Sequence, residues 1–73
     1  MKKTLVRDAW SGKELNIEYD LEKDAMLLNG VEVERMRELE DEGDPFVYRK
    51  KGGNQFDELY HLSKEQVENL RSK

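Results

Sequence analysis

The sequence predicts a small α+β domain with a small antiparallel sheet of two hairpins and two short helices, in the order ββαββα. One segment alternates apolar and polar residues with the period of a strand, and two others repeat apolar residues with the period of a helix. The chain has 73 residues, of which 36% are hydrophobic. This length allows one domain, residues 1–73, and no second independent core. The simplest such architecture packs both helices over one face of the sheet.

The first hairpin is expected over residues 3–9 and 14–21. In the second of these segments every other residue is apolar, and the residues between them are polar. Such a strand buries one face and leaves the other in solvent, where it is available for binding. Ser11 and Gly12 supply the turn.

In the middle of the chain the spacing of the apolar residues changes from that of a strand to that of a helix. The Asn-Gly pair at 29–30 is typical of a tight turn, and residues 25–28 could form a short strand before it. Apolar residues then recur every three to four positions, and Gly43 and Pro45 supply stop signals. We therefore expect a short helix over residues 33–42.

The last third predicts a second hairpin and a second helix. A strand begins after Pro45 and leads to a glycine turn at 52–53. Residues 55–62 fit both strand and helix spacing, and strand is favoured because this segment can return as the partner of the preceding one. Ser63 and Gln66 then form a capping-box pattern that opens a helix over residues 64–72.

Several chemistries find no support in the sequence. The absence of cysteine excludes disulfides and thiolate zinc sites. His61 is the only histidine, and we interpret it as a strand residue with a satisfied ring rather than a catalytic group. No Ser-His-acid arrangement or phosphate-binding loop is present, so we expect a protein that is not an enzyme and has no cofactor.

The acidic run has the ligand spacing of a calcium-binding loop but lacks the residue types that such a loop requires. Glu38, Glu40, Glu42 and Gly43 follow the spacing of such a loop, yet glutamates are too long for its first positions, and Arg49 takes the place of the closing carboxylate. We therefore expect no metal. No apolar run approaches the roughly 18 residues of a membrane span, and the basic start lacks the apolar core of a signal peptide. A cytoplasmic protein without membrane contact is expected.

Charge is unevenly distributed along the chain. The net charge is −1 over residues 1–31, −5 over residues 32–44 and +2 over residues 45–73. In the helix expected over 33–42, basic residues come early and acidic residues late, which opposes the helix dipole. This arrangement suggests an acidic surface for a basic protein partner, although a solvated face that keeps the protein soluble explains it as well. The candidate partner-binding residues are Glu38, Glu40, Asp41, Glu42 and Asp44.

A basic hairpin tip offers an alternative. Arg49, Lys50 and Lys51 could contact phosphates while Tyr48 and Phe56 stack on bases. Three positive charges on an acidic protein would give only weak nucleic-acid binding. The simpler interpretation, which we favour, is a solvated turn whose lysines discourage edge pairing.

Trp10 lies at the first hairpin turn. We expect it to cover the small core; if it is exposed instead, it becomes the first candidate for a partner anchor.

The sequence therefore predicts a non-enzymatic protein-interaction module, a small regulator or inhibitor that presents an acidic surface to a basic protein partner, of which a nucleic-acid-binding protein is one example. The alternative is a nucleic-acid-binding module that uses residues 49–51. A homodimer joined through edge strands or a sheet face is compatible with either. In size and charge density the chain resembles small bacterial or bacteriophage accessory proteins, without a motif that carries this resemblance.

Overall fold

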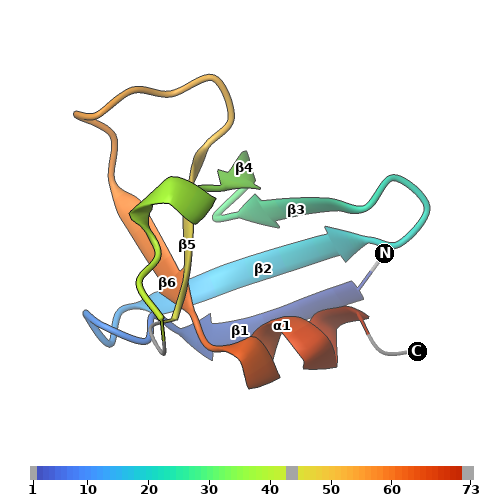
Figure 1. Ribbon diagram of the computed structural model, residues 1–73. Coiled ribbons are helices and arrows are strands. Elements are labelled where there is room, and N and C mark those ends of the chain that lie inside the picture. Colours follow the sequence, from blue (N-terminus) through green and yellow to red (C-terminus); the bar gives the residue numbers. More distant parts are fainter. Residues whose placement is uncertain (1, 43–44, 72–73) are drawn as a thin grey trace.

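The computed structural model describes residues 2–42 and 45–71. Its elements follow one another as a simple meander that bends strongly, so that β5 and β6 run across the direction of β1, β2 and β3 (Figure 1). The elements are β1 (Lys2–Arg7), β2 (Glu14–Asp20), β3 (Ala25–Leu28), β4 (Val31–Arg35), the 3-10 turn η1 (Arg37–Leu39), β5 (Phe46–Lys50), β6 (Leu59–Leu62) and α1 (Lys64–Arg71).

The predicted ββαββα order with two helices is wrong. The structure is mainly one six-stranded antiparallel sheet, in the order β1-β2-β3-β4-β5-β6, curved into a half-barrel. Within the described ranges, α1 is the one α-helix. The two hairpins do not form separate units, because β3 and β4 join them into a continuous ladder.

The first hairpin is confirmed. β1 pairs with β2 from Lys2↔Tyr19 to Arg7↔Glu14, and the inward residues of β2 are buried while Glu14 and Asn16 are exposed. Both predicted strands run too far at their C-terminal ends: Asp8 and Ala9 lie in the turn after β1, and Leu21 lies beyond β2 and is exposed.

The helix predicted over residues 33–42 does not form. Residues 31–35 form β4, which pairs with β3 on one side and β5 on the other, so that Val33 lies opposite both Met26 and Lys50. The turn at 29–30, with positive φ at both residues, returns the chain directly onto β3. β3 pairs with residues 31–33 and β5 with residues 33–35, so each residue of the segment has a strand partner on at least one edge, and only η1, three residues long, is helical.

The second hairpin is confirmed in part. β5 pairs with β6 from Phe46↔Leu62 to Arg49↔Leu59, so the preference for a strand holds over residues 59–62. Residues 51–58 instead form a long loop that arches away from the sheet (Figure 1).

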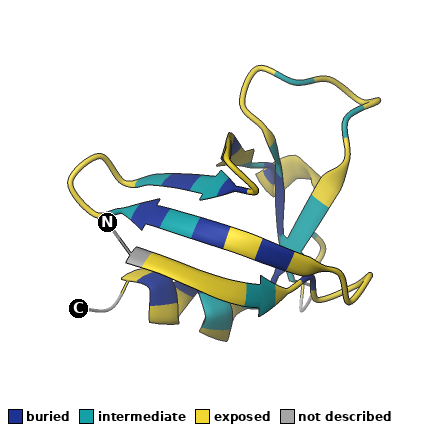
Figure 2. Cartoon of the chain, turned by 180° about the vertical axis from the view of Figure 1, so that it is seen from behind, coloured by how far each residue is buried: buried dark blue, intermediate teal, exposed yellow. Residues whose placement is uncertain are grey.

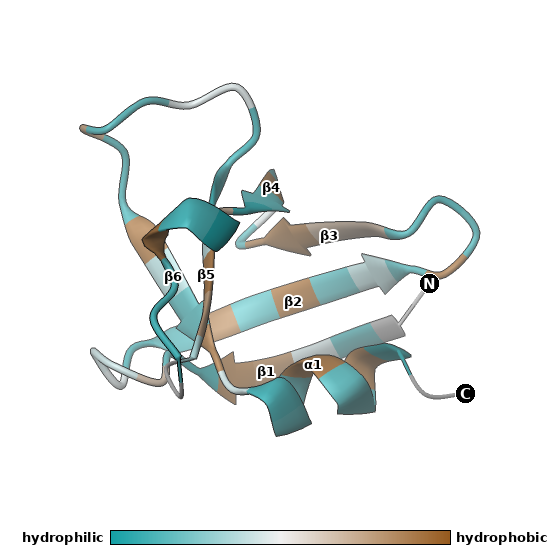
Figure 3. Cartoon of the chain, in the orientation of Figure 1, coloured by the Kyte–Doolittle hydropathy of each residue, from teal (hydrophilic) through white to brown (hydrophobic). Residues whose placement is uncertain are grey.

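The core lies on the concave side of the sheet and is completed by α1. Val67 and Leu70 are each 2% exposed, and the buried residues of β2 alternate with exposed or half-buried ones (Figure 2). The same helix is hydrophobic in one stripe and hydrophilic elsewhere (Figure 3). The capping box is confirmed: the Ser63 hydroxyl accepts the Gln66 N–H at 3.1 Å, and the Gln66 side chain accepts the Ser63 N–H at 2.8 Å.

At one end of the half-barrel, the turn after β1 is hydrogen-bonded to β6, the last strand. The Ala9 N–H donates to the His61 carbonyl at 2.8 Å, and the His61 N–H donates to the Asp8 carboxylate at 2.8 Å. On the edge formed by β1, the Gln66 side-chain amide donates to the Arg7 carbonyl at 3.1 Å. These contacts occupy backbone groups that a neighbouring strand would need, so both sheet edges are partly covered at this end.

Candidate functional site

A shallow groove of about 200 Å³ lies on the convex side of β5 and β6. Tyr60 and Leu62 of β6 turn inward to the core, so the alternation of the strand places Leu59 and His61 on the outer face, beside Val47 of β5. The turn after β1 forms one wall and the segment around η1 the other. The lining residues are Trp10, Leu39, Asp41, Pro45, Val47, Leu59 and His61.

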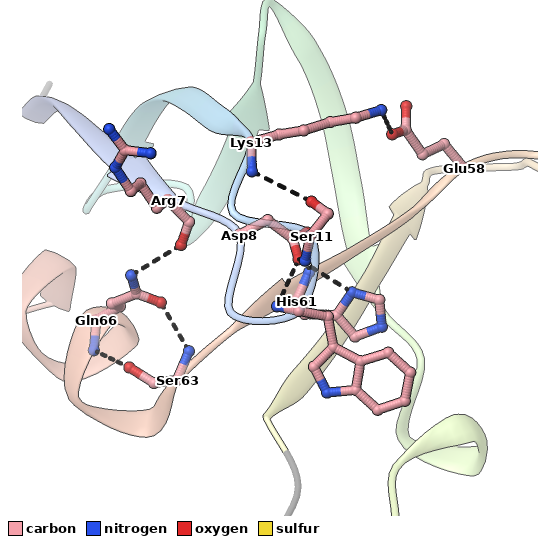
Figure 4. A network of polar contacts seen from close by, with 9 residues as sticks. Arg7, Asp8, Ser11, Lys13, Glu58, His61, Ser63 and Gln66 are labelled. Atoms are coloured by element: carbon pink, nitrogen blue, oxygen red, sulfur yellow. Dashed lines mark hydrogen bonds and ion pairs between the residues drawn. The ribbon is translucent and has the colours of Figure 1, made fainter.

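Asp8 shapes the wall that carries Trp10. Its Oδ1 atom accepts the N–H groups of Trp10 at 2.8 Å and of Ser11 at 2.9 Å, while Oδ2 accepts the N–H of His61 at 2.8 Å (Figure 4). Burial raises the pKa of Asp8, but the hydrogen bonds from Ser11, His61 and Trp10 outweigh it, and the pKa falls below its ordinary value. The buried carboxylate thus stays ionised and fixes the turn.

Trp10 is exposed rather than a lid on the core. Its indole stacks on the imidazole of His61, with ring centroids 4.7 Å apart and planes 5° apart, and 69% of the residue remains accessible. The Nδ1 atom of His61 lies 3.4 Å from Oδ1 of Asp8. His61 is therefore a strand residue that supports Trp10, and one face of the indole is offered to solvent.

Among the predicted acidic residues, Glu40 is held inside the fold. Its carboxylate accepts two hydrogen bonds from Arg35, at 2.9 and 2.8 Å, and the N–H of Val47 at 3.0 Å. The bond from Arg35 lowers the pKa of Glu40 more than burial raises it. Arg35 also stacks on Phe46, 3.7 Å from the ring centroid. This carboxylate ties η1 to β4 and β5, so it is not offered to a partner.

The other acidic residues differ from Glu40. Asp41 lines the groove, while Glu38 and Glu42 are exposed beside it in the sequence, and none of the three joins an ion pair with another described residue. Asp44 lies outside the described residues. No α-helix forms over these residues, so the reversed helix dipole expected here does not exist. The carboxylates of Glu38, Asp41 and Glu42 nevertheless stay without an ion pair among the described residues.

The basic tip does not act as one cluster. Tyr48 is buried in the core, so its ring is not available for stacking. Lys51 pairs with Glu32 at 3.0 Å, and the Nε atom of Arg49 is buried without a hydrogen-bond partner among the described residues. Lys50 and Phe56 remain exposed.

Comparison of the chain with models of known protein families, with curated proteins and with solved structures finds no match. Within the described ranges, no three side chains of the kinds that hold metal ions are grouped together. No helix in the same ranges has the length and apolar character needed to cross a bilayer.

Sequence reasoning missed the groove itself, and with it Leu39 and Leu59. The signal available was in β6, where Leu59 and Leu62 are apolar on opposite faces of the strand. A strand that is apolar on both sides while the core needs only one side indicates a second apolar surface.

Proposed function

We propose that the chain is a non-enzymatic protein-interaction module that binds a basic protein partner through the groove on β5 and β6. The observation that carries the proposal is the meeting of exposed apolar side chains with an unpaired carboxylate. Trp10, Leu39 and Leu59 are all partly or largely exposed around one depression, and Asp41 lies in its lining.

The apolar part supplies the contact energy. An exposed tryptophan held in a fixed position is the residue type most enriched at the energetic centres of interfaces. Here the stack on His61 and the hydrogen bonds to Asp8 hold the indole and its backbone before any partner arrives. Little side-chain freedom is then lost on binding, which favours affinity.

The acidic part supplies selectivity. Asp41 gives the groove one negative charge, and the exposed Glu38 and Glu42, which are close to Asp41 in the sequence, add two more; none of the three joins an ion pair with a described residue. A basic partner is attracted to these charges and an acidic one is repelled, and the effect weakens as salt screens it. The best-fitting partner segment has an apolar anchor next to lysine or arginine.

A random peptide library displayed on phage tests the proposal without a known partner. Selection on the wild-type protein, with removal of phage that also bind the Trp10→Ala variant, is expected to enrich an apolar residue followed by basic ones. Leu21→Ala is the matched control for the variant, because Leu21 is exposed but lies away from the groove. Enrichment of no peptide after this removal, or of peptides that lack the apolar and basic residues, would contradict the proposal.

Nucleic-acid binding through the β5–β6 loop is the second candidate. It is favoured by the high exposure of Phe56 and by Lys50, which joins no ion pair with a described residue. The burial of Tyr48 and the pairing of Lys51 with Glu32 count against it. Fluorescence anisotropy with a labelled thymidine oligonucleotide tests it: binding that is lost in Phe56→Ala and in Lys50→Gln supports this candidate, and no binding at low salt removes it.

A further inference from the structure

One edge of β1 is free to accept a further strand. β1 is the first strand in the sheet order, so β2 is its strand neighbour and its other edge has none within the described ranges. The backbone of Asn16 in β2 faces β3, because its N–H donates to Oδ1 of Asn29 at 3.0 Å and its carbonyl accepts the Asn29 N–H at 2.8 Å. Backbone groups point to alternate sides along an antiparallel strand, so the next residue, Ile17, faces β1 and pairs with Thr4. Leu5 follows Thr4 and therefore faces the free edge.

Lys3 and Arg7 face the free edge in the same way, because each is two residues from Leu5. The Arg7 carbonyl is already occupied there, since it accepts the side-chain amide of Gln66 at 3.1 Å. The backbone N–H and C=O groups of Lys3 and Leu5 form no hydrogen bond with another described residue. An extended segment that lies along this edge would therefore meet two residues whose main-chain groups are unpaired, which is the arrangement used in recognition by strand addition.

A second groove, the β1–α1 groove, has a volume of about 270 Å³ and lies between this edge and α1, which runs beside β1 (Figure 2). Its lining residues are Thr4, Val6, Gln66, Asn69 and Leu70. Thr4 belongs to the inner face of β1, yet it is exposed while its partner Ile17 is only 1% exposed. The core is thus covered at β2 and open at β1. Side chains of a strand alternate between the two faces of a sheet, so every second side chain of an added strand would enter this groove.

The outer face of the same edge is basic. Residues 1–7 contain three basic residues and no acidic one, in a protein whose net charge is −4. Lys3 and Arg7 lie on this face with 72% of each side chain exposed, and their ion pairs with glutamates of β2 are long, at 3.9 and 3.7 Å. On the helix side, the β1–α1 groove is lined by the neutral amides of Gln66 and Asn69. The charge next to the free edge is therefore positive.

A second copy of this chain fits the edge poorly. An antiparallel pair of two β1 strands centred on Leu5 would place Lys3 of each copy opposite Arg7 of the other. Like charges directly opposite one another destabilise a strand pair, whereas opposite charges stabilise it. A strand with carboxylates at the positions opposite Lys3 and Arg7 is therefore the better occupant.

We propose that β1 binds an extended acidic peptide segment, which adds to the sheet as a further strand beside α1. Its main chain pairs with Lys3 and Leu5, its inward side chains enter the β1–α1 groove, and its outward carboxylates lie next to Lys3 and Arg7. The matching pattern is acidic, apolar, polar, apolar, acidic. Because Gln66 occupies the Arg7 carbonyl, main-chain pairing ends before Arg7, and the second carboxylate meets its side chain alone.

Fluorescence anisotropy with a labelled synthetic peptide that contains Glu-Val-Thr-Val-Glu tests the proposal. This sequence reads the same in both directions, so it fits an added strand of either orientation. The interface is small, and a dissociation constant between about 10 µM and about 1 mM is expected. A peptide with Lys-Val-Thr-Val-Lys in its place should bind about tenfold more weakly or worse. Equal binding of the two peptides, or no binding at about 1 mM, overturns the proposal.

Variants of the edge separate charge from main-chain pairing. Lys3→Glu should weaken binding of the acidic peptide about tenfold, while Lys50→Glu makes the same change at an exposed position of β5 and should leave binding unaltered. Leu5→Pro removes an N–H that faces the free edge rather than β2, and it should abolish binding. Circular dichroism verifies the folding of each variant, and Lys3→Glu carries the test where the proline variant does not fold. Unchanged binding in Lys3→Glu overturns the proposal.

Hydrogen exchange followed by nuclear magnetic resonance places the peptide. Saturation with the acidic peptide should slow exchange of the Lys3 and Leu5 amides about tenfold or more, because these N–H groups become paired. Unchanged rates at both amides would place the contact elsewhere and overturn the proposal. Slowing that rises with protein concentration without peptide would assign the edge to a second copy and also overturn it. The β1–α1 groove shares no lining residue with the groove on β5 and β6, so this inference does not rest on the proposed function and the two fail independently.

Discussion

Asp8 and His61, 53 residues apart in the chain, meet through two contacts that serve different purposes. The backbone N–H of His61 donates to Oδ2 of Asp8 at 2.8 Å, which closes the half-barrel. The Nδ1 atom of His61 lies 3.4 Å from Oδ1, the same oxygen that holds the N–H of Trp10. One carboxylate therefore joins the closure of the fold to the wall of the candidate site.

Replacing this carboxylate should destabilise the protein. In Asp8→Asn one oxygen becomes an amide NH₂ that cannot accept a backbone N–H, so at least one buried donor is left without a partner. Such a donor costs about 1–3 kcal/mol. Urea unfolding followed by circular dichroism measures the loss. Asp41→Asn is the control, because this exposed carboxylate makes no hydrogen bond within the described ranges, and a change of less than about 0.5 kcal/mol is expected. Equal stability of Asp8→Asn and wild type would contradict the role given to Asp8.

Stability should also fall in acid. The pKa values of Asp8 and Glu40 are lower in the folded protein than their ordinary values, so the unfolded chain binds protons more readily than the folded one. Their contribution is fully present above the unfolded pKa values of about 3.9 and 4.3, and it is lost as the pH falls from there through the folded values. Urea midpoints measured from neutral pH downward should therefore drop below about pH 5. In Asp8→Asn the drop should be shallower; an unchanged slope would mean that Asp8 does not contribute.

Local patterns in the sequence were reliable where local forces decide the structure. The alternation of Leu15, Ile17 and Tyr19 predicted the buried face of β2, and the pairing of Ser63 with Gln66 predicted the start of α1. Each of these depends on residues that are neighbours along a strand or within one helical turn.

The features of the fold and of the candidate site that the sequence did not predict depend on contacts between distant segments. The spacing of Val33, Met36 and Leu39 fits a helix, yet Val33 is buried by pairing with β3 and β5, and Leu39 is exposed in the groove wall. The site could not be assembled from the sequence, because its walls come from the β1–β2 turn, η1 and β6. Trp10 stacks on His61 of β6, far away in the chain, and no local pattern encodes this contact.

Glu40 and Glu38 should respond differently to the same change, although they are two residues apart in an acidic run. Glu40→Gln removes the charge that pairs with Arg35 and should lower the free energy of unfolding by about 1–3 kcal/mol. Glu38→Gln changes an exposed side chain and should stay within about 0.5 kcal/mol of wild type. Chemical denaturation of both variants in parallel measures the difference. If both variants changed the free energy of unfolding equally, Glu40 would not have the structural role given to it here.

The stack of Trp10 on His61 should order the indole in solution. The chain has one tryptophan and one histidine, and their rings are stacked 4.7 Å apart. His61→Ala removes the ring on which the indole packs, so the emission of Trp10 and the resonance of its indole N–H should both move toward those of an indole surrounded by water. His61→Phe keeps a flat ring at this position and should stay closer to wild type in both signals. Identical signals in wild type and His61→Ala would contradict the stacked arrangement in solution. Since Trp10 forms a wall of the groove, His61→Ala should also weaken binding of the selected peptides.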